Sequence, residues 1–342
     1  MSKVINVHTH YQPESVLEIV KPYDIEMVDK DGAWYFRSGS AEYLLPKGTG
    51  TANFWGANLG DQIPEMDSNG IDINVLQPSP MVFSYHLEPS VNKTFSEAFN
   101  DETARHIAEH PDRFWGSAQL PMQDLELAAA ELERAVGQLG LKSCSVGYVL
   151  GPDRTLADPE CDEFLATAAR LDVPVLLHPV ALAQDIDIKA GGAEWLSKYQ
   201  VDWAWGYLFS ETAAVIGLIF GGALDRHPDL RVMVPHGGGM IPYQLGRLRY
   251  QGEVFGAKGG SIERDPLQYL DRLYFDTVVH EPASLELLIE VMGPDNVVMG
   301  SNYPGWDNAP IWETIRQLDL DDEAKEKVLG RTAAERLFKE EV

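Results

Sequence analysis

The sequence predicts an α/β fold, a closed (β/α)₈ barrel of the TIM type with a small β-hairpin inserted after its first strand. Two observations predict it. Eight short runs of β-branched and apolar residues recur along the chain, and longer helical patterns separate them. Such alternation is typical of buried parallel strands joined by amphipathic helices. A length of 342 residues fits one barrel, although length alone would also allow two domains.

The predicted elements follow one another in chain order. The strand runs are Val4–Val7, Ile71–Gln77, Phe114–Gln119, Cys144–Val149, Val173–His178, Arg231–Val234, Leu273–Asp276 and Val297–Gly300. The clearest helical patterns between them are Val91–His110 and Leu125–Leu139. Each of these patterns is long enough to return the chain to the start of the next parallel strand.

The connection after the first strand, residues 11–64, is unusually long. Within it, the runs Ile25–Val28 and Ala33–Arg37 flank the turn sequence Asp29–Gly32, which predicts a β-hairpin. Long loops in a compact domain are commonly functional, and the βα loops of a barrel lie on its catalytic face. We therefore expect residues 1–342 to form a single domain in which residues 11–64 cover the barrel mouth.

The composition excludes two classes of partner. The chain has 27 Lys and Arg against 53 Asp and Glu, a net charge of −26, and no basic run. Such a surface repels phosphate backbones and anionic lipids, so we expect neither nucleic-acid nor membrane binding. An anionic substrate would need a local cationic anchor.

The longest apolar stretch, Ala213–Leu224, is too short to span a bilayer. The N-terminus leaves no room for a signal peptide. We therefore expect a cytoplasmic protein.

Four histidines stand at the predicted carboxyl ends of strands. His8 and His10 are two residues apart and therefore face the same side of the first strand. His178 ends the fifth run, and His236 ends the sixth, directly before three glycines. The carboxyl ends of barrel strands meet at one mouth, so the four imidazoles should converge there. An HxH pair by itself is a weak signal, but convergence of four histidines favours a metal site over core packing.

These motifs together resemble those of a known family. The set comprises HxH, a later strand-terminal His, HGGG followed by GR, and a GS-x-YP segment after the last strand. It is similar to the metal-dependent amidohydrolase-2 family, and within it to the 2-amino-3-carboxymuconate-6-semialdehyde decarboxylases. The segment HGGGMIPYQLGR also resembles the 4-oxalomesaconate hydratases. The resemblance extends from residue 4 to about residue 338, so it implies the barrel fold but not one reaction.

The resemblance implies roles for five residues. His8, His10 and His178 would be metal ligands, and His236 would be a catalytic histidine. Arg247, in the GR that follows HGGG, would bind a substrate carboxylate, for which a guanidinium is the best-suited side chain. Without the resemblance, a surface ion pair would be the simpler interpretation of Arg247. The resemblance also implies a homodimer or a higher homo-oligomer, with an arginine crossing the interface.

Asn302 stands where the resemblance leads us to expect an acid. The decarboxylases of the family have an aspartate here, which ligates the metal and takes part in proton transfer, and the hydratases have a glutamate. An amide matches the acid in size, but it is neutral and cannot act as a base or a proton donor at ordinary pH. Either Asn302 is an inactivating substitution made to trap a ligand, or the natural enzyme works without this carboxylate. We favour the second, and in both cases place Asn302 among the metal-site and catalytic residues.

Five further residues are candidates for contact with a substrate. His86 follows the second strand, and His280 lies just beyond the seventh. Trp205 and Tyr207, with Trp203, suggest an aromatic wall for a planar ligand, although core packing would explain them equally well. Tyr303 belongs to the GS-x-YP segment. Asp276 could orient a catalytic histidine or cap its strand, and Glu211 could simply favour the start of its helix.

Three functions fit this set of residues. The first is a metal-dependent, non-oxidative decarboxylase or related lyase that acts on a small conjugated or aromatic carboxylic acid. The second keeps the site but adds water to a C=C bond or hydrolyses a C–C, ester or amide bond. The third, motivated by Asn302, is a ligand-binding pseudoenzyme. The cofactor would be a divalent metal, with zinc favoured by the histidines and manganese as the alternative.

Overall fold

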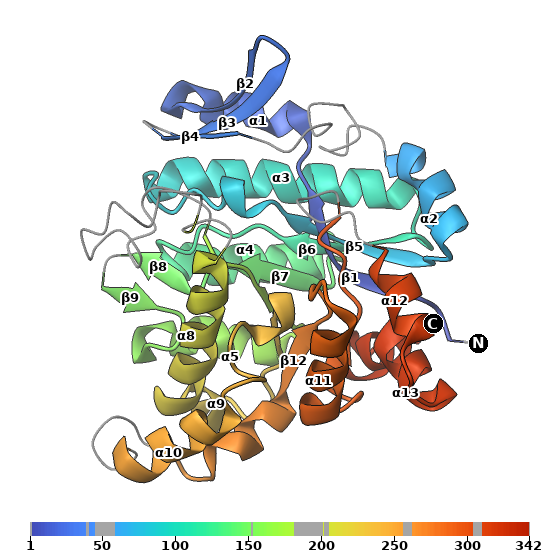
Figure 1. Cartoon of the computed structure of the whole chain (residues 1–342). Coiled ribbons are helices and arrows are strands. Elements are labelled where there is room, and N and C mark those ends of the chain that lie inside the picture. Colours follow the sequence, from blue (N-terminus) through green and yellow to red (C-terminus); the bar gives the residue numbers. More distant parts are fainter. Residues whose placement is uncertain are drawn as a thin grey trace.

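Eight parallel strands form the centre of the molecule in the computed structural model, which describes residues 2–38, 41–44, 59–151, 153–180, 201, 205–255, 262–303 and 310–341 (Figure 1). In sheet order they are β1 (Ile5–Tyr11), β5 (Ile73–Pro78), β6 (Phe114–Ala118), β7 (Ser143–Val146), β10 (Val175–Leu177), β11 (Val232–Val234), β12 (Leu273–Asp276) and β13 (Val297–Val298). Every predicted run overlaps one of them, so the predicted eight-stranded barrel is confirmed.

Backbone hydrogen bonds between the segment after β13 and β1 close the barrel. The Val7 N–H donates to the Met299 carbonyl at 2.8 Å, and the His10 N–H donates to the Tyr303 carbonyl at 2.7 Å. In the opposite direction, the Asn302 N–H donates to the His8 carbonyl at 2.8 Å. Two predicted metal ligands and Asn302 therefore lie along this closing seam.

Helices surround the strands, and their apolar faces pack on the outside of the barrel. The described α-helices are α1 (Glu14–Val20), α2 (Ile63–Asn69), α3 (Pro89–Glu109), α4 (Leu125–Gly137), α5 (Asp162–Arg170), α8 (Gly206–Phe220), α9 (Ala223–Arg226), α10 (Leu245–Phe255), α11 (Pro282–Met292), α12 (Ile311–Gln317) and α13 (Asp322–Glu326). The helical segments Lys327–Arg331 and Ala333–Phe338 complete the chain. No described helix is long and apolar enough to cross a membrane.

The barrel interior is filled at one end by apolar side chains. Ile5, Val7 and their counterparts on neighbouring strands form this cluster together with Leu337 and Phe338 from the C-terminal helical segment. The Phe338 ring lies 5.1 Å from the Trp115 ring, measured between centroids. The chain terminus thus covers the amino-terminal end of the strands, and polar chemistry is left to the carboxyl-terminal end.

The predicted hairpin is present within residues 11–64. Strand β2 (Ile25–Lys30) pairs antiparallel with β3 (Ala33–Ser38) around Asp31 and Gly32, which have positive φ angles of 56° and 82° as a two-residue turn of this type requires. A third strand, β4 (Ala41–Leu44), extends the sheet, and a second small sheet joins β8 (Val149–Gly151) to β9 (Arg154–Thr155). Figure 1 shows β2, β3 and β4 at the top of the molecule, beyond the carboxyl end of β1. Residues 45–58 of the insertion lie outside the described residues.

Candidate active site

An irregularity in β1 brings its histidines into the barrel. Asn6 pairs with Asn74, and Thr9 pairs with Leu76. Between these two pairs β1 advances by three residues and β5 by only two, so β1 contains one extra residue. Val7 belongs to the interior apolar cluster, and the adjacent His8 also meets residues of the barrel interior. A β-bulge of this kind re-aims side chains next to functional sites. It allows one strand both to fill the core and to present His8 and His10 at the mouth.

The three predicted ligands His8, His10 and His178 converge. One ring nitrogen from each lies within 4.8 Å of the others. Ring centroids are 5.0 Å apart for His8 and His10, 5.3 Å for His8 and His178, and 5.1 Å for His10 and His178. These side chains come from β1 and from the end of β10, which are not neighbours in the sheet. The barrel geometry is therefore what brings them together.

Hydrogen bonds fix the orientation of two of these imidazoles. His8 donates from Nδ1 to Asp276 Oδ2 at 2.5 Å, and His178 donates from Nδ1 to the Pro179 carbonyl at 2.9 Å. A carboxylate and a carbonyl only accept, so in the neutral imidazoles the proton is on Nδ1. Each Nε2 then carries the lone pair that a metal ion uses. Burial and the neighbouring histidines lower the pKa of His10 and of His178 well below its ordinary value, which also favours the neutral form.

Asp276 connects the cluster to the rest of the barrel. It is fully buried, and besides His8 it accepts hydrogen bonds from the Gly237 N–H at 3.1 Å and the Val278 N–H at 3.0 Å. Burial alone would raise the pKa of this carboxyl, but the hydrogen bond and the charge of His8 outweigh it and hold the pKa below its ordinary value. Asp276 is thus a buried negative charge beside the histidines, and it favours a cation there.

Asn302 lies at the edge of the same cluster. Its Oδ1 accepts a hydrogen bond from His10 Nε2 at 2.8 Å, and its backbone has a positive φ of 59°, which Asn tolerates better than most residues. The His10 Nδ1 is buried and makes no hydrogen bond within the described part of the chain. A cation would replace the proton that Nε2 shares with the amide oxygen. Three neutral imidazoles, an amide oxygen and a nearby carboxylate fit a divalent metal ion.

His236 forms a second functional unit with Glu211. Its Nδ1 lies 2.5 Å from Glu211 Oε1, and its ring centroid is 5.3 Å from that of His8 and 5.4 Å from that of His178. Glu211 is only 2% exposed, and burial raises the pKa of its carboxyl to about 7 although the contact with His236 opposes the rise. A carboxyl with a pKa of about 7 that is hydrogen-bonded to an imidazole can share and exchange a proton with it.

The turn after His236 depends on glycine. His236 itself has a positive φ of 47°, an uncommon conformation that concentrates at functional sites. At Gly239, where φ is +64°, a Cβ atom would lie 2.2 Å from the Leu208 carbonyl oxygen. The turn therefore packs its backbone directly against α8, the helix that carries Glu211. This packing brings the HGGG turn next to α8 and so places His236 beside Glu211.

The remaining candidates divide into one that joins the cluster and five that the structure places elsewhere or at the surface. The Tyr207 ring centroid lies 5.6 Å from that of His178 and 6.1 Å from that of His236. Tyr303 instead donates from its hydroxyl to Glu65 Oε2 at 2.8 Å, on the outer side of β1. The exposed candidates are His86, Trp205, Arg247 and His280. Trp203 lies outside the described residues. Substrate contacts of all these side chains remain predictions.

Two functional residues carried only weak sequence signals. Asp276 is an acid at a strand end, and Glu211 is an acid near a helix start. Both positions have an ordinary structural explanation, so sequence alone could not choose between the roles. Their distances to His8 and His236 would have identified them, and these distances are known only once the chain is folded.

Comparison with known proteins agrees with this geometry. A family model described as Amidohydrolase matches residues 5–339. The chain belongs to the amidohydrolase family. It is 29% identical over 294 residues to a 2-amino-3-carboxymuconate-6-semialdehyde decarboxylase of Dictyostelium discoideum, covering 83% of this chain and 77% of that protein. It is 28% identical to a 2-keto-4-carboxy-3-hexenedioate hydratase of a Sphingobium strain, covering 72% and 69% of the two chains.

Solved structures of amidohydrolases share the fold over the full length of the chain. The 5-carboxyvanillate decarboxylase from Sphingomonas paucimobilis superposes with a TM-score of 0.84 at 24% identity, covering 100% of both chains. The dihydroxybenzoic acid decarboxylase from Polaromonas sp. JS666 superposes with a TM-score of 0.77 at 23% identity, covering 99% of this chain and 97% of that one. That second structure contains manganese and the inhibitor 2-nitroresorcinol.

The raised pKa of Glu211 predicts a specific pH dependence of stability. Its carboxyl has a pKa of about 7 in the folded protein against an ordinary 4.5, so the folded state keeps a proton that the unfolded chain loses in this window. Ionisation therefore costs stability as the pH rises from 4.5 to 7. Glu211→Gln removes the cost, and its free energy of unfolding relative to the native protein should rise by about 2–3 kcal/mol between pH 5 and pH 7.

Urea unfolding in the presence of a chelator measures this difference. Glu286→Gln, at an exposed carboxylate on α11, is the matched control and should show no such trend. A pH-independent difference between Glu211→Gln and the native protein would contradict the assignment.

Proposed function

We propose that this amidohydrolase is a divalent-metal-dependent, non-oxidative decarboxylase of a small conjugated or aromatic carboxylic acid. The observation that carries the proposal is the pairing of two units at one barrel mouth: the ligand cluster His8, His10 and His178, and the His236–Glu211 pair. The relatives named as decarboxylases of such acids support it. A divalent cation bound by the three histidines, with Asn302 beside it, supplies Lewis-acid polarisation of a substrate oxygen.

His236 and Glu211 can supply the proton that replaces CO₂ on the substrate. Loss of CO₂ leaves an electron pair on carbon, and a proton must be delivered to that carbon. Glu211 holds His236 at Nδ1, and His236 would deliver this proton through its other ring nitrogen, Nε2. Glu211, with a pKa of about 7, can return a proton to the imidazole after each turnover. Tyr207 adds an aromatic side against which a planar ring can pack.

The donor set suits two different metal ions. Imidazole nitrogens suit zinc, whereas the amide oxygen of Asn302 and the manganese in the Polaromonas structure favour manganese. We therefore propose that either ion binds and that activity should be assayed with both.

Release of CO₂ is the decisive assay for the reaction. With manganese or zinc and a panel of dihydroxybenzoic and carboxyvanillic acids, we expect CO₂ and the decarboxylated product. His178→Ala should lose both metal and turnover, because it removes a ligand. His236→Ala should keep the metal but lower kcat by about 10²–10⁴-fold, the usual contribution of proton transfer.

The controls and alternatives are equally concrete. His110→Gln changes a histidine outside the cluster, next to the Phe114 ring, and should behave as the native protein. Incorporation of water without CO₂ would identify a hydratase or hydrolase, the second candidate, which the hydratase relative favours. Ligand binding without any product, even with added metal, would identify a pseudoenzyme and overturn both reactions.

Asn302 should limit the affinity for the metal. Asn302→Asp adds a negative charge next to His10 Nε2, so we expect the metal to bind about 10–100 times more tightly. Turnover should rise as well, since the carboxylate can exchange a proton. Chelator competition measures the affinity. Asn69→Asp, which adds the same charge at the last residue of α2, should leave the metal affinity unchanged, and equal effects of the two variants would show that Asn302 has no role at the metal.

We further propose that the protein is a homodimer in which Arg247 serves the partner's site. Large apolar side chains are exposed in two segments of the chain. Trp205 and Phe209 lie at the start of α8, and the second segment contributes Met240, Tyr243, Tyr250 and Val254. The Met240 N–H donates to Thr212 Oγ1 at 2.9 Å, so these two segments are neighbours. On α10, Tyr250 and Val254 follow Arg247 at i+3 and i+7 on one helix face.

A second copy is the occupant that this face fits best. Chains of charge −26 repel one another, so association needs a local apolar area and a cation, and this face provides both. Tyr250→Asp should convert the dimer to monomers in sedimentation velocity, whereas Leu287→Asp, at an exposed leucine on α11, should not. A native protein that sediments as a monomer would exclude the proposal.

A further inference from the structure

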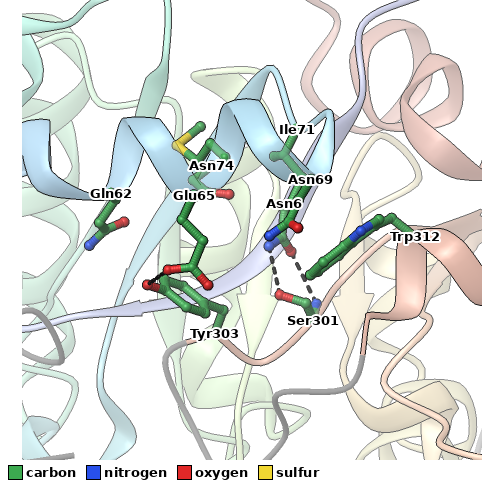
Figure 2. A pocket seen from close by; sticks show the side chains of 10 residues that line it. Asn6, Gln62, Glu65, Asn69, Ile71, Asn74, Ser301, Tyr303 and Trp312 are labelled. Carbon is green, nitrogen blue, oxygen red and sulfur yellow. Dashed lines mark hydrogen bonds between the residues drawn. The ribbon is translucent and has the colours of Figure 1, made fainter.

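We propose that Asn6 is a positioning residue that holds Asn302 against the histidine cluster from the outer face of the barrel. This inference rests on the proposed metal site, because it assigns to Asn6 a part in the affinity for the cation. Asn6 lies two residues before His8 on β1, but it takes no part in the histidine cluster and lines a pocket outside the barrel (Figure 2).

Asn6 contacts Ser301 through both polar atoms of its side chain. The Asn6 amide donates from Nδ2 to Ser301 Oγ at 2.7 Å, and its Oδ1 accepts from the Ser301 N–H at 3.0 Å. The two residues are 1% and 5% exposed, so both hydrogen bonds are shielded from water. A two-point contact of this kind fixes both the peptide plane and the side chain of Ser301, the residue directly before Asn302.

Asn302, the residue after Ser301, has a left-handed backbone conformation. Asn302 has a φ of +59°, its N–H donates to the His8 carbonyl, and its side-chain oxygen accepts from His10. Residues 301 and 302 are therefore bonded to β1 on two sides: Ser301 to Asn6 on the outer face, and Asn302 to the strand that carries His8 and His10. A left-handed residue persists only when its surroundings determine it, and Asn6 is part of those surroundings.

A second outer contact lies one residue further on. Tyr303 donates to Glu65 of α2. Burial, then the hydrogen bond to Glu65 and its charge, raise the pKa of this phenol, so it stays a donor. Figure 2 shows both contacts in one pocket between α2, β1 and α12. Glu65 is exposed, so water competes for its hydrogen bond with Tyr303, whereas both hydrogen bonds of Asn6 are shielded from water. Asn6 is for this reason the principal positioning residue.

The chain offers a matched control in Asn74. It is the register partner of Asn6 on β5, it is also 1% exposed, and it lines the same pocket. Its Oδ1 makes no hydrogen bond within the described residues, in contrast to Asn6. Asn74→Leu therefore makes the same change of side chain at the same burial, and it removes neither of the hydrogen bonds that Asn6 makes with Ser301.

The test measures manganese affinity in a double-mutant cycle on the full chain. Asn6→Leu should weaken binding about tenfold, the usual effect of removing a residue that orients a ligand, and Asn6→Asp, which still accepts from the Ser301 N–H and hydroxyl, should restore most of it. Asn74→Leu should change nothing. In the Asn302→Ala background, Asn6→Leu should have less than a twofold effect, because the residue it positions is gone.

Melting temperatures of the metal-free variants supply an independent reading. The decrease caused by Asn6→Leu should be clearly smaller in the Asn302→Ala background than in the native one. Equal effects of Asn6→Leu in the two backgrounds, on either affinity or melting temperature, would overturn the inference. A native protein that binds no divalent metal would refute the proposed function, while the melting temperatures would still decide whether Asn6 positions Asn302.

Discussion

The buried carboxylate of Asp276 is the constraint on which the site depends. It stands at the end of β12 and accepts hydrogen bonds from His8 on β1, from the Gly237 N–H after β11, and from the Val278 N–H of its own chain segment. A fully buried charge would be costly without such partners, and three N–H donors offset that cost. One residue thereby fixes the tautomer of a metal-ligand candidate and the turn that carries His236. Both functional units share a common anchor.

The electrostatics of the site run against those of the whole molecule. Within the described residues, this chain of net charge −26 brings His8, His10 and His178 together at the barrel mouth. Burial favours neutrality in His10 and His178, and it also keeps Glu211 protonated up to about pH 7. In the proposed function the positive charge needed by an anionic substrate comes from the bound cation, and further from Arg247 of a second copy. The acidic surface then serves to exclude polyanions without opposing catalysis.

Much of the fold was predictable because it rests on local patterns. Apolar runs marked all eight strands, and the Asp-Gly turn marked the hairpin, since both depend on short-range preferences. The strand-terminal histidines were predictable for the same reason. Other features depend on long-range geometry. The irregular register between Asn6 and Thr9 has no sequence signature, and the roles of Asp276 and Glu211 appear only when distant strands and helices meet.

The central claim is that His8, His10 and His178 hold one divalent metal ion beside Asn302. Anomalous diffraction from crystals of the full chain grown with manganese, measured above and below the metal absorption edge, tests it most directly. The account predicts a single strong peak within bonding distance of one nitrogen from each of the three histidines. A peak elsewhere, or none at full manganese occupancy of the solution, would contradict it.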